Sequence, residues 1–165
     1  MKGAMYNEKQ EIMPAFVNII MMAVTVSLVA VAAYVIYEYG FDDDAMWLLI
    51  TAVIIAAVTV LMMFLKIKIA VSYDSLIVGV FKGRTVPIKE IVSVAVEEFS
   101  AIKDYGGWGL RYNLKTKTLG YIARGTNKGM RINTADGKSF LVSSKRVNEF
   151  QGALNMVLRT VKRTE

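Results

Sequence analysis

The fold is decided by two apolar runs and the link between them: PAFVNIIMMAVTVSLVAVAAYVIY (14–37), EYGFDDD (38–44) and AMWLLITAVIIAAVTVLMMFL (45–65). Neither run contains Asp, Glu, Lys or Arg over its 24 and 21 residues. As α-helices they would be about 36 Å and about 31 Å long, and the hydrocarbon core of a bilayer is about 30 Å thick. The alternative is a buried hairpin in a soluble protein, but such helices normally carry a polar stripe. The sequence therefore predicts a two-helix transmembrane hairpin at 14–65.

Charge separates this hairpin from the rest of the chain. Hydrophobic residues make up 55% of the sequence, and the mean hydropathy of +0.41 is high for a soluble protein. Residues 1–65 have 2 basic and 6 acidic side chains, a net charge of −4, whereas residues 66–165 have 18 and 8, a net charge of +10. We expect a polar cytoplasmic tail at 1–13, the hairpin with an external acidic loop at 38–44, and one domain at 66–165, which is long enough to bury its own core.

Basic residues predict the orientation of the hairpin. Lys2 and Lys9 precede the first run, Lys66 and Lys68 directly follow the second, and the acidic loop contains neither Lys nor Arg. The positive-inside rule then places both termini in the cytoplasm, with a multi-pass anchor in the cell (inner) membrane. The first run is longer than the apolar region of a usual signal peptide, which favours an uncleaved anchor.

The two runs contain small residues but no ionisable ones. Ala52 and Ala56 have the small-xxx-small spacing that lets helices approach closely, either within the hairpin or against a second copy. The lack of intramembrane charge argues against a proton relay or an ion pathway. Asp42, Asp43 and Asp44 could attract a cation, but hard cations need more oxygen ligands than this short run can orient, so we expect no metal site.

After Leu65 the apolar pattern changes to a period of two, broken by turns, which is typical of short strands. An amphipathic helix is predicted from about Lys145 to Arg163, with Ser144 as its N-cap. The expected strands lie within 67–71, 76–81, 86–99, 109–114, 118–124, 129–134 and 139–143, and the apolar stripe of the helix contains Val147, Phe150, Leu154, Val157, Leu158 and Val161.

Three segments carry a resemblance to a known family: Val86–Ile91, Gly106–Tyr112 and Asp136–Ser144. In this order, and followed by the closing helix, they resemble the bacterial and archaeal PH-like (pleckstrin-homology-like) membrane proteins, in which two transmembrane helices often precede the domain. The resemblance covers nearly the whole chain. It implies an α+β fold in which a barrel or sandwich of about seven antiparallel strands is closed by one C-terminal helix. These families are mostly uncharacterised, so the resemblance implies architecture rather than activity.

Gly107, Trp108, Gly109 and Arg111 are candidate family-signature or ligand-face residues. Glycine permits a positive φ or a bulge, and an indole fills space beside it, so the segment is either a strand entry with a tryptophan at the core or rim, or a surface on which a ligand stacks. Arg111 falls on the opposite strand face from Trp108 unless a bulge at Gly109 brings the two together.

Lys66, Lys68, Lys82 and Arg84 are candidates for binding the membrane surface, because each cation near an anionic leaflet contributes about 1 kcal/mol. Lys82 and Arg84 flank a turn in the region where PH domains tend to bind phosphoinositide headgroups, although such sites normally have a longer basic run. Generic positive-inside charge is the other explanation for these residues.

Catalysis is not predicted. The sequence contains no Cys and no His, which excludes disulfides, thiol nucleophiles, histidine bases and the usual zinc sites. Glu97 and Glu98 are adjacent, and on a strand they would point to opposite faces. No cofactor motif or nucleic-acid recognition motif is present. We therefore expect a non-enzymatic membrane protein whose cytoplasmic PH-like domain is a protein-binding or assembly module, for an unknown partner or a second copy of itself. The alternative is a sensor of anionic lipid headgroups.

Overall fold

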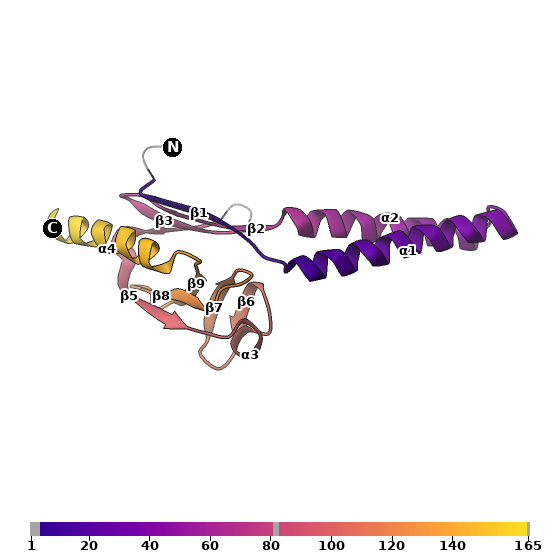
Figure 1. The fold of residues 1–165 in the computed structure, drawn as a ribbon. Coiled ribbons are helices and arrows are strands. Elements are labelled where there is room, and N and C mark those ends of the chain that lie inside the picture. The colour runs from indigo at the N-terminus through magenta and orange to yellow at the C-terminus, as the bar shows by residue number, and fades with distance from the viewer. Residues whose placement is uncertain (1–3, 81–82, 165) are drawn as a thin grey trace. The chain divides into compact units, whose positions relative to one another are not determined.

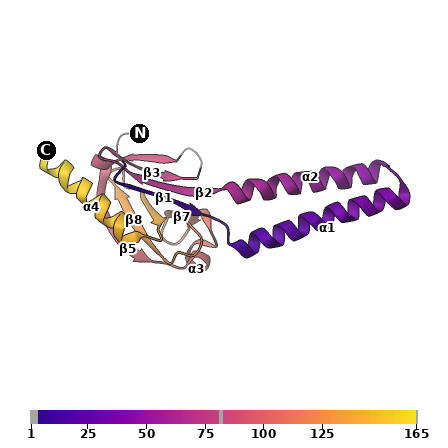
Figure 2. The ribbon, with the colours of Figure 1, turned by 45° about the horizontal axis from the view of Figure 1, so that its top comes forward.

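The computed structural model describes residues 4–80 and 83–164. The chain forms two compact units: residues 13–65, here called the hairpin, and residues 1–12 together with 66–165, here called the sheet domain. Figure 1 shows the elements of both units, and Figure 2 shows them in a second view.

The hairpin consists of helices α1 (Ala15–Tyr39) and α2 (Asp43–Phe64), which lie side by side in both views (Figures 1 and 2). Both helices are long and apolar enough to cross a membrane, as predicted. The acidic loop has a structural role, because Asp42 is the N-cap of α2 and its Oδ1 accepts a hydrogen bond from the Ala45 N–H at 2.8 Å. Asp43 and Asp44 lie in the first helical turn, where the helix dipole favours negative charge.

Small and hydroxyl side chains form the contact between the two helices. The buried residues of α2 are Ala45, Ala52 and Thr59, which recur every seven residues, and the buried residue of α1 is Ala32. Thr25, seven residues before Ala32, places its Oγ1 3.3 Å from that of Thr59. A seven-residue period keeps one narrow seam facing the neighbouring helix. Ala52 therefore packs the hairpin on itself, which is one of the two roles predicted for it.

Replacing Ala52 with Leu is expected to separate the helices, since overpacking a close contact costs about 1–3 kcal/mol. The natural chain has no cysteine, so a Thr25→Cys, Thr59→Cys pair reports directly on the seam. We expect Ala52→Leu to lower the yield of this disulfide about tenfold, because a cost of about 1.4 kcal/mol changes an equilibrium constant tenfold. Ala57→Leu is the matched control, because Ala57 is exposed. Equal disulfide yields in the two variants would rule out close packing of α1 and α2 at Ala52.

The sheet domain contains two open sheets (Figure 1). The first has the order β1-β2-β3-β4 and is antiparallel throughout, and the second has the order β5-β8-β9-β7-β6 with one parallel pair, β7 and β9. The strands are β1 (Tyr6–Glu11), β2 (Lys66–Val71), β3 (Ser75–Gly79), β4 (Arg84–Pro87), β5 (Ile91–Glu98), β6 (Gly109–Asn113), β7 (Thr118–Ile122), β8 (Lys128–Thr134) and β9 (Ser139–Ser143). Three helices complete the domain: the 3-10 helix η1 (Ile88–Glu90), α3 (Ala101–Tyr105) and α4 (Val147–Thr164).

Of the barrel or sandwich of about seven antiparallel strands predicted from the sequence, the barrel is not supported, and the β7–β9 pair is parallel. The described residues form nine strands in two sheets, neither of which closes on itself. The coarser prediction is confirmed, since two long apolar helices are followed by a sheet domain that ends in an amphipathic helix.

The predicted tail at residues 1–13 contains a strand instead. β1 pairs with β2 in antiparallel register from Tyr6 opposite Val71 to Glu11 opposite Lys66. Because β1 precedes α1 in the chain and β2 follows α2, the two strands on either side of the hairpin pair with each other. The sheet domain is thus assembled from both flanks of the hairpin rather than from residues 66–165 alone.

The core lies on the inner faces of the two sheets and under α4. Phe150, Leu154 and Val157 of α4 are fully buried, and the helix contacts β1 and β2 of the first sheet and β5 and β8 of the second. The predicted stripe on this helix is therefore confirmed as a packing surface at Val147, Phe150, Leu154 and Val157, whereas Leu158 and Val161 are partly exposed. The sheets contribute fully buried side chains at Ile67, Ile69, Val71, Leu76, Val78, Met130, Ile132, Phe140 and Val142.

A buried polar cluster joins β1 to the start of α4. The Glu8 carboxylate accepts hydrogen bonds from the Tyr6 hydroxyl, from Ser144 Oγ at 2.7 Å and from the Lys145 N–H at 3.2 Å. Ser144 Oγ in turn accepts from the Arg146 N–H at 3.0 Å. Burial, together with the hydrogen bond to Glu8, raises the pKa of the Tyr6 hydroxyl above its usual range. Tyr6 therefore remains a hydrogen-bond donor to the buried carboxylate.

Ring stacking and a hydrogen bond from a side-chain amide also join β1 to the segment around the start of α4. The Tyr6 ring stacks on Phe150 with centroids 5.3 Å apart, and the Arg146 guanidinium lies 5.1 Å from the Tyr6 ring centroid. Further along β1, Gln10 Nε2 donates to the Ser143 carbonyl at 2.9 Å. Every second residue of β1 thus faces inward, and each of these contacts the segment that leads into α4.

Candidate functional site

The glycine-tryptophan segment forms the connection between α3 and β6. Gly107 and Gly109 have φ angles of 134° and 96°, which glycine adopts readily and other residues rarely do. Trp108 packs against the buried cluster of Phe99, Tyr105, Ile122 and Leu141. The indole is thus a core-rim side chain, although it also lines an open cleft with Phe99, Ser100, Ala101, Ile102, Gly125, Thr126 and Asn127.

Arg111 contacts this segment through the backbone. Its Nε donates to the Trp108 carbonyl at 2.9 Å, and a Cβ built on Gly107 would lie 3.6 Å from its Nη2. The structure therefore brings the four signature candidates together as one folded turn, with the exposed Arg111 guanidinium lying against it.

The basic candidates separate onto two faces of the first sheet. Lys66 and Lys68 are exposed on the outer face, where Lys9 of β1 lies directly opposite Lys68. Arg84 is instead half-buried, with its guanidinium 5.1 Å from the centroid of the buried Phe140 ring. The fourth candidate, Lys82, lies outside the described residues. Lys9 is an addition that the sequence did not suggest, because its strand was predicted to be a tail.

The adjacent carboxylates of β5 are each held by a basic residue of β8. Glu97 is engaged by Arg131, whose Nη2 donates to Oε1 at 2.8 Å, and this hydrogen bonding raises the pKa of Arg131. Glu98 pairs with Lys128 at 3.0 Å. Within residues 4–80 and 83–164, no group of three or more acidic side chains is arranged to hold a metal ion.

An open groove runs between β5 and α4. It is lined by Val92, Ser93 and Val94 on the strand and by Asn155, Leu158 and Arg159 on the helix. β5 is the first strand of its sheet, and among the described residues it pairs with β8 alone, which leaves its other edge without a strand partner there. Val92, at a register shift between Ile91 and Ser93, is 62% exposed. The groove therefore combines unpaired strand backbone, apolar side chains and one cation.

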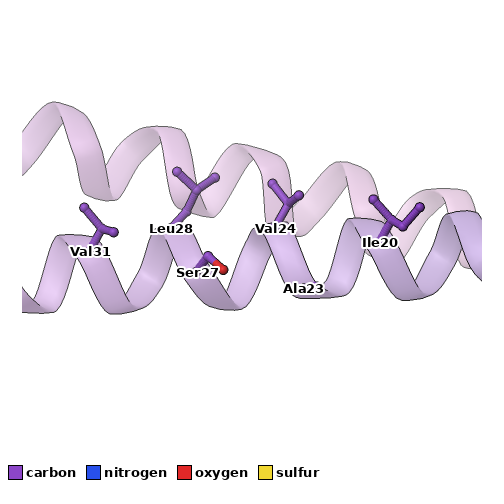
Figure 3. Close-up of a pocket in the computed structure, with 6 residues that line it drawn as sticks. All are labelled: Ile20, Ala23, Val24, Ser27, Leu28 and Val31. Carbon is purple, nitrogen blue, oxygen red and sulfur yellow. The ribbon is translucent and has the colours of Figure 1, made fainter.

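A second groove lies on the surface of α1 and is shown in Figure 3. It is apolar apart from one hydroxyl, which suits it to contact with acyl chains or another apolar helix. Its lining residues are Ile20, Ala23, Val24, Ser27, Leu28 and Val31.

No protein-family model matches the chain, and a search of the curated proteins finds no match. The functional proposal therefore rests on the geometry of the surfaces described above.

Proposed function

We propose that this protein is a non-enzymatic, membrane-anchored binding module. In this proposal the hairpin anchors the chain in the cell membrane with both termini in the cytoplasm, and the PH-like sheet domain binds an extended segment of a partner protein in the groove between β5 and α4. The orientation is supported by the exposed Lys9, Lys66 and Lys68, which flank the hairpin in the sequence, and by the loop at 38–44, which has no basic residue.

The free edge of β5 carries the proposal. Soluble proteins usually protect an edge strand by keeping it short or by placing Lys or Pro on it. β5 is eight residues long, contains three valines, and before Glu97 and Glu98 at its end has no charged residue and no Pro. Beyond the irregularity at Val92 it keeps a regular register from Ser93 to Glu98. An exposed strand of this kind is a template to which another strand can add.

The side wall of the groove indicates which kind of segment would fit. Strand addition supplies main-chain hydrogen bonds, whereas specificity comes from alternate side chains of the added strand. Leu158 and the β5 valines offer apolar contacts, Asn155 offers an amide, and Arg159 offers an exposed cation. We therefore expect a partner segment that alternates apolar and polar residues and has an acidic residue near Arg159.

Photocrosslinking of the full-length protein in its native membrane tests this proposal. A photoreactive residue at Ser93 is expected to capture a partner, which could be a second copy, whereas one at Lys115, on the turn beyond the opposite sheet edge, is not. Val92→Asp should reduce the capture at Ser93 at least about tenfold, since a charge placed in an apolar contact costs more than about 1.4 kcal/mol.

Met156→Asp is the matched control, because Met156 is exposed on α4 to a similar extent, 58%, and does not line the groove. Equal capture at Ser93 and Lys115, or equal loss in the Val92 and Met156 variants, would contradict binding at β5.

A further inference from the structure

An apolar row follows β6, at the opposite edge of the five-stranded sheet. Leu110 and Tyr112 alternate within β6, so they point to the same face, and Leu114 follows in the turn after the strand. Leu110 and Tyr112 are each more than half exposed, and Leu114 is 83% exposed. On the neighbouring strand Tyr121, which pairs with Leu110, is buried. The face that is covered at the centre of the sheet is therefore exposed at β6.

We call these three residues, Leu110, Tyr112 and Leu114, the β6 rim. Exposed large apolar side chains that lie together mark surfaces that contact something other than water. The opposite face of the sheet is covered differently, because Trp108 and α3 pack there against Ile122 and Leu141.

Within the sheet domain, the start of β6 contacts the residues that follow β1. A Cβ built on Gly109 would lie 3.4 Å from Ile12 Cγ2. Nearby, the Arg124 N–H donates to the Glu11 carbonyl at 3.0 Å, and Arg124 Nη1 lies 3.2 Å from Glu11 Oε2. Ile12 is three residues before Ala15, the first residue of α1, and three residues span at most about 10 Å. The start of β6 thus contacts a residue that lies three positions before the hairpin helix in the sequence.

The residue types of the β6 rim match those of an interfacial anchor. Trp and Tyr are enriched where a protein meets lipid headgroups, and cations beside them favour an anionic leaflet. Between Ser100 and Thr118 the chain has one carboxylate, Asp104, and four basic residues, which are Lys103, Arg111, Lys115 and Lys117.

We propose that the β6 rim inserts into the headgroup region of an anionic phospholipid bilayer, with Leu110, Tyr112 and Leu114 reaching toward the acyl chains and Lys115 and Lys117, in the turn that follows, contacting phosphates. The lipid interface is the occupant that explains both the exposed apolar row and the surrounding positive charge. This contact is separate from the groove at β5, which lies at the other edge of the same sheet.

Spin labels on single cysteines in the otherwise cysteine-free, full-length protein test this proposal. The label is placed at Leu110→Cys, at Leu114→Cys, or at Met156→Cys as the exposed control on α4. The protein is reconstituted into vesicles of phosphatidylcholine containing phosphatidylglycerol. We expect the two rim labels to be several-fold less accessible to an aqueous nickel complex, and more accessible to oxygen, than the Met156 label. The double substitution Lys115→Glu, Lys117→Glu should abolish this difference, because the anionic vesicles would then repel the rim.

Equal nickel accessibility of the rim and Met156 labels in these vesicles would overturn the proposal. Protection of the rim in native membranes but not in pure lipid would also overturn it, because the rim would then be covered by a protein. Neither result depends on capture at Ser93, so failure of the lipid contact and failure of the β5 groove are distinguishable.

Discussion

A sheet domain that lacks residues 1–12 is expected not to fold, even though residues 66–165 contain eight of the nine described strands. Removing β1 exposes the edge of β2, takes the Tyr6 ring away from Phe150 and leaves Ser144 without its partner Glu8. Each large buried side chain contributes about 1.5–3 kcal/mol, and an entire small domain is stable by only about 5–15 kcal/mol. The loss of β1 is therefore comparable to the whole stability of the domain.

Two polypeptides without the hairpin allow this to be measured. Because Glu11 lies opposite Lys66, a short Asn-Gly turn can join residues 1–12 directly to residues 66–165. We expect the joined polypeptide to unfold cooperatively on heating and residues 66–165 alone to show no cooperative transition. The same Tm for both polypeptides would show that β1 is dispensable.

Glu8→Ala is expected to destabilise the sheet domain strongly. The carboxylate is buried and accepts three hydrogen bonds, two of which come from Ser144 and Lys145 at the approach to α4. Removing it leaves buried donors unpaired, each of which costs about 1–3 kcal/mol. We predict a loss of about 3 kcal/mol or more, the sum of these costs over the three donors.

The neighbouring residue supplies the control for this substitution. The Asn7 side chain is exposed, and its backbone carbonyl accepts a hydrogen bond from Arg146 Nη2 at 2.8 Å, which does not depend on the side chain. Asn7→Ala should therefore change stability by less than about 0.5 kcal/mol, as surface substitutions usually do. Urea unfolding of the joined polypeptide measures both variants. Similar midpoints for Glu8→Ala and Asn7→Ala would mean that the cluster around Glu8 contributes little.

The parts of the fold that depend on local pattern could be predicted from the sequence. Two uncharged runs longer than 20 residues predict spanning helices without reference to the rest of the chain, and a three- and four-residue apolar period predicts α4. The sequence did not reveal β1 because its inward residues are Tyr6, Glu8 and Gln10, so the strand lacks the apolar alternation by which strands are found. Its polar side chains are buried only because α4 returns to meet them.

Sheet order is the other property that the sequence could not supply. Whether strands close into a barrel or form two open sheets depends on pairings between distant segments, such as the parallel contact of β7 with β9. The same pairings decide which strand is an edge, and so the groove at β5 could not be predicted from the Val-Ser-Val-Ala-Val pattern alone. The strands also decide which basic candidates are exposed. Alternation along β4 turns the Arg84 side chain inward over Phe140, whereas the side chains of Lys66 and Lys68 on β2 are exposed.

The most direct test of the proposed binding module is amide hydrogen exchange of β5 in the complex captured through Ser93, compared with the free full-length protein. If a partner segment adds to the free edge, exchange should slow at the amides of Ser93–Glu98 that point away from β8, while the amides of β6 keep their rates. Unchanged exchange throughout β5 in the captured complex would contradict strand addition and with it the proposed function.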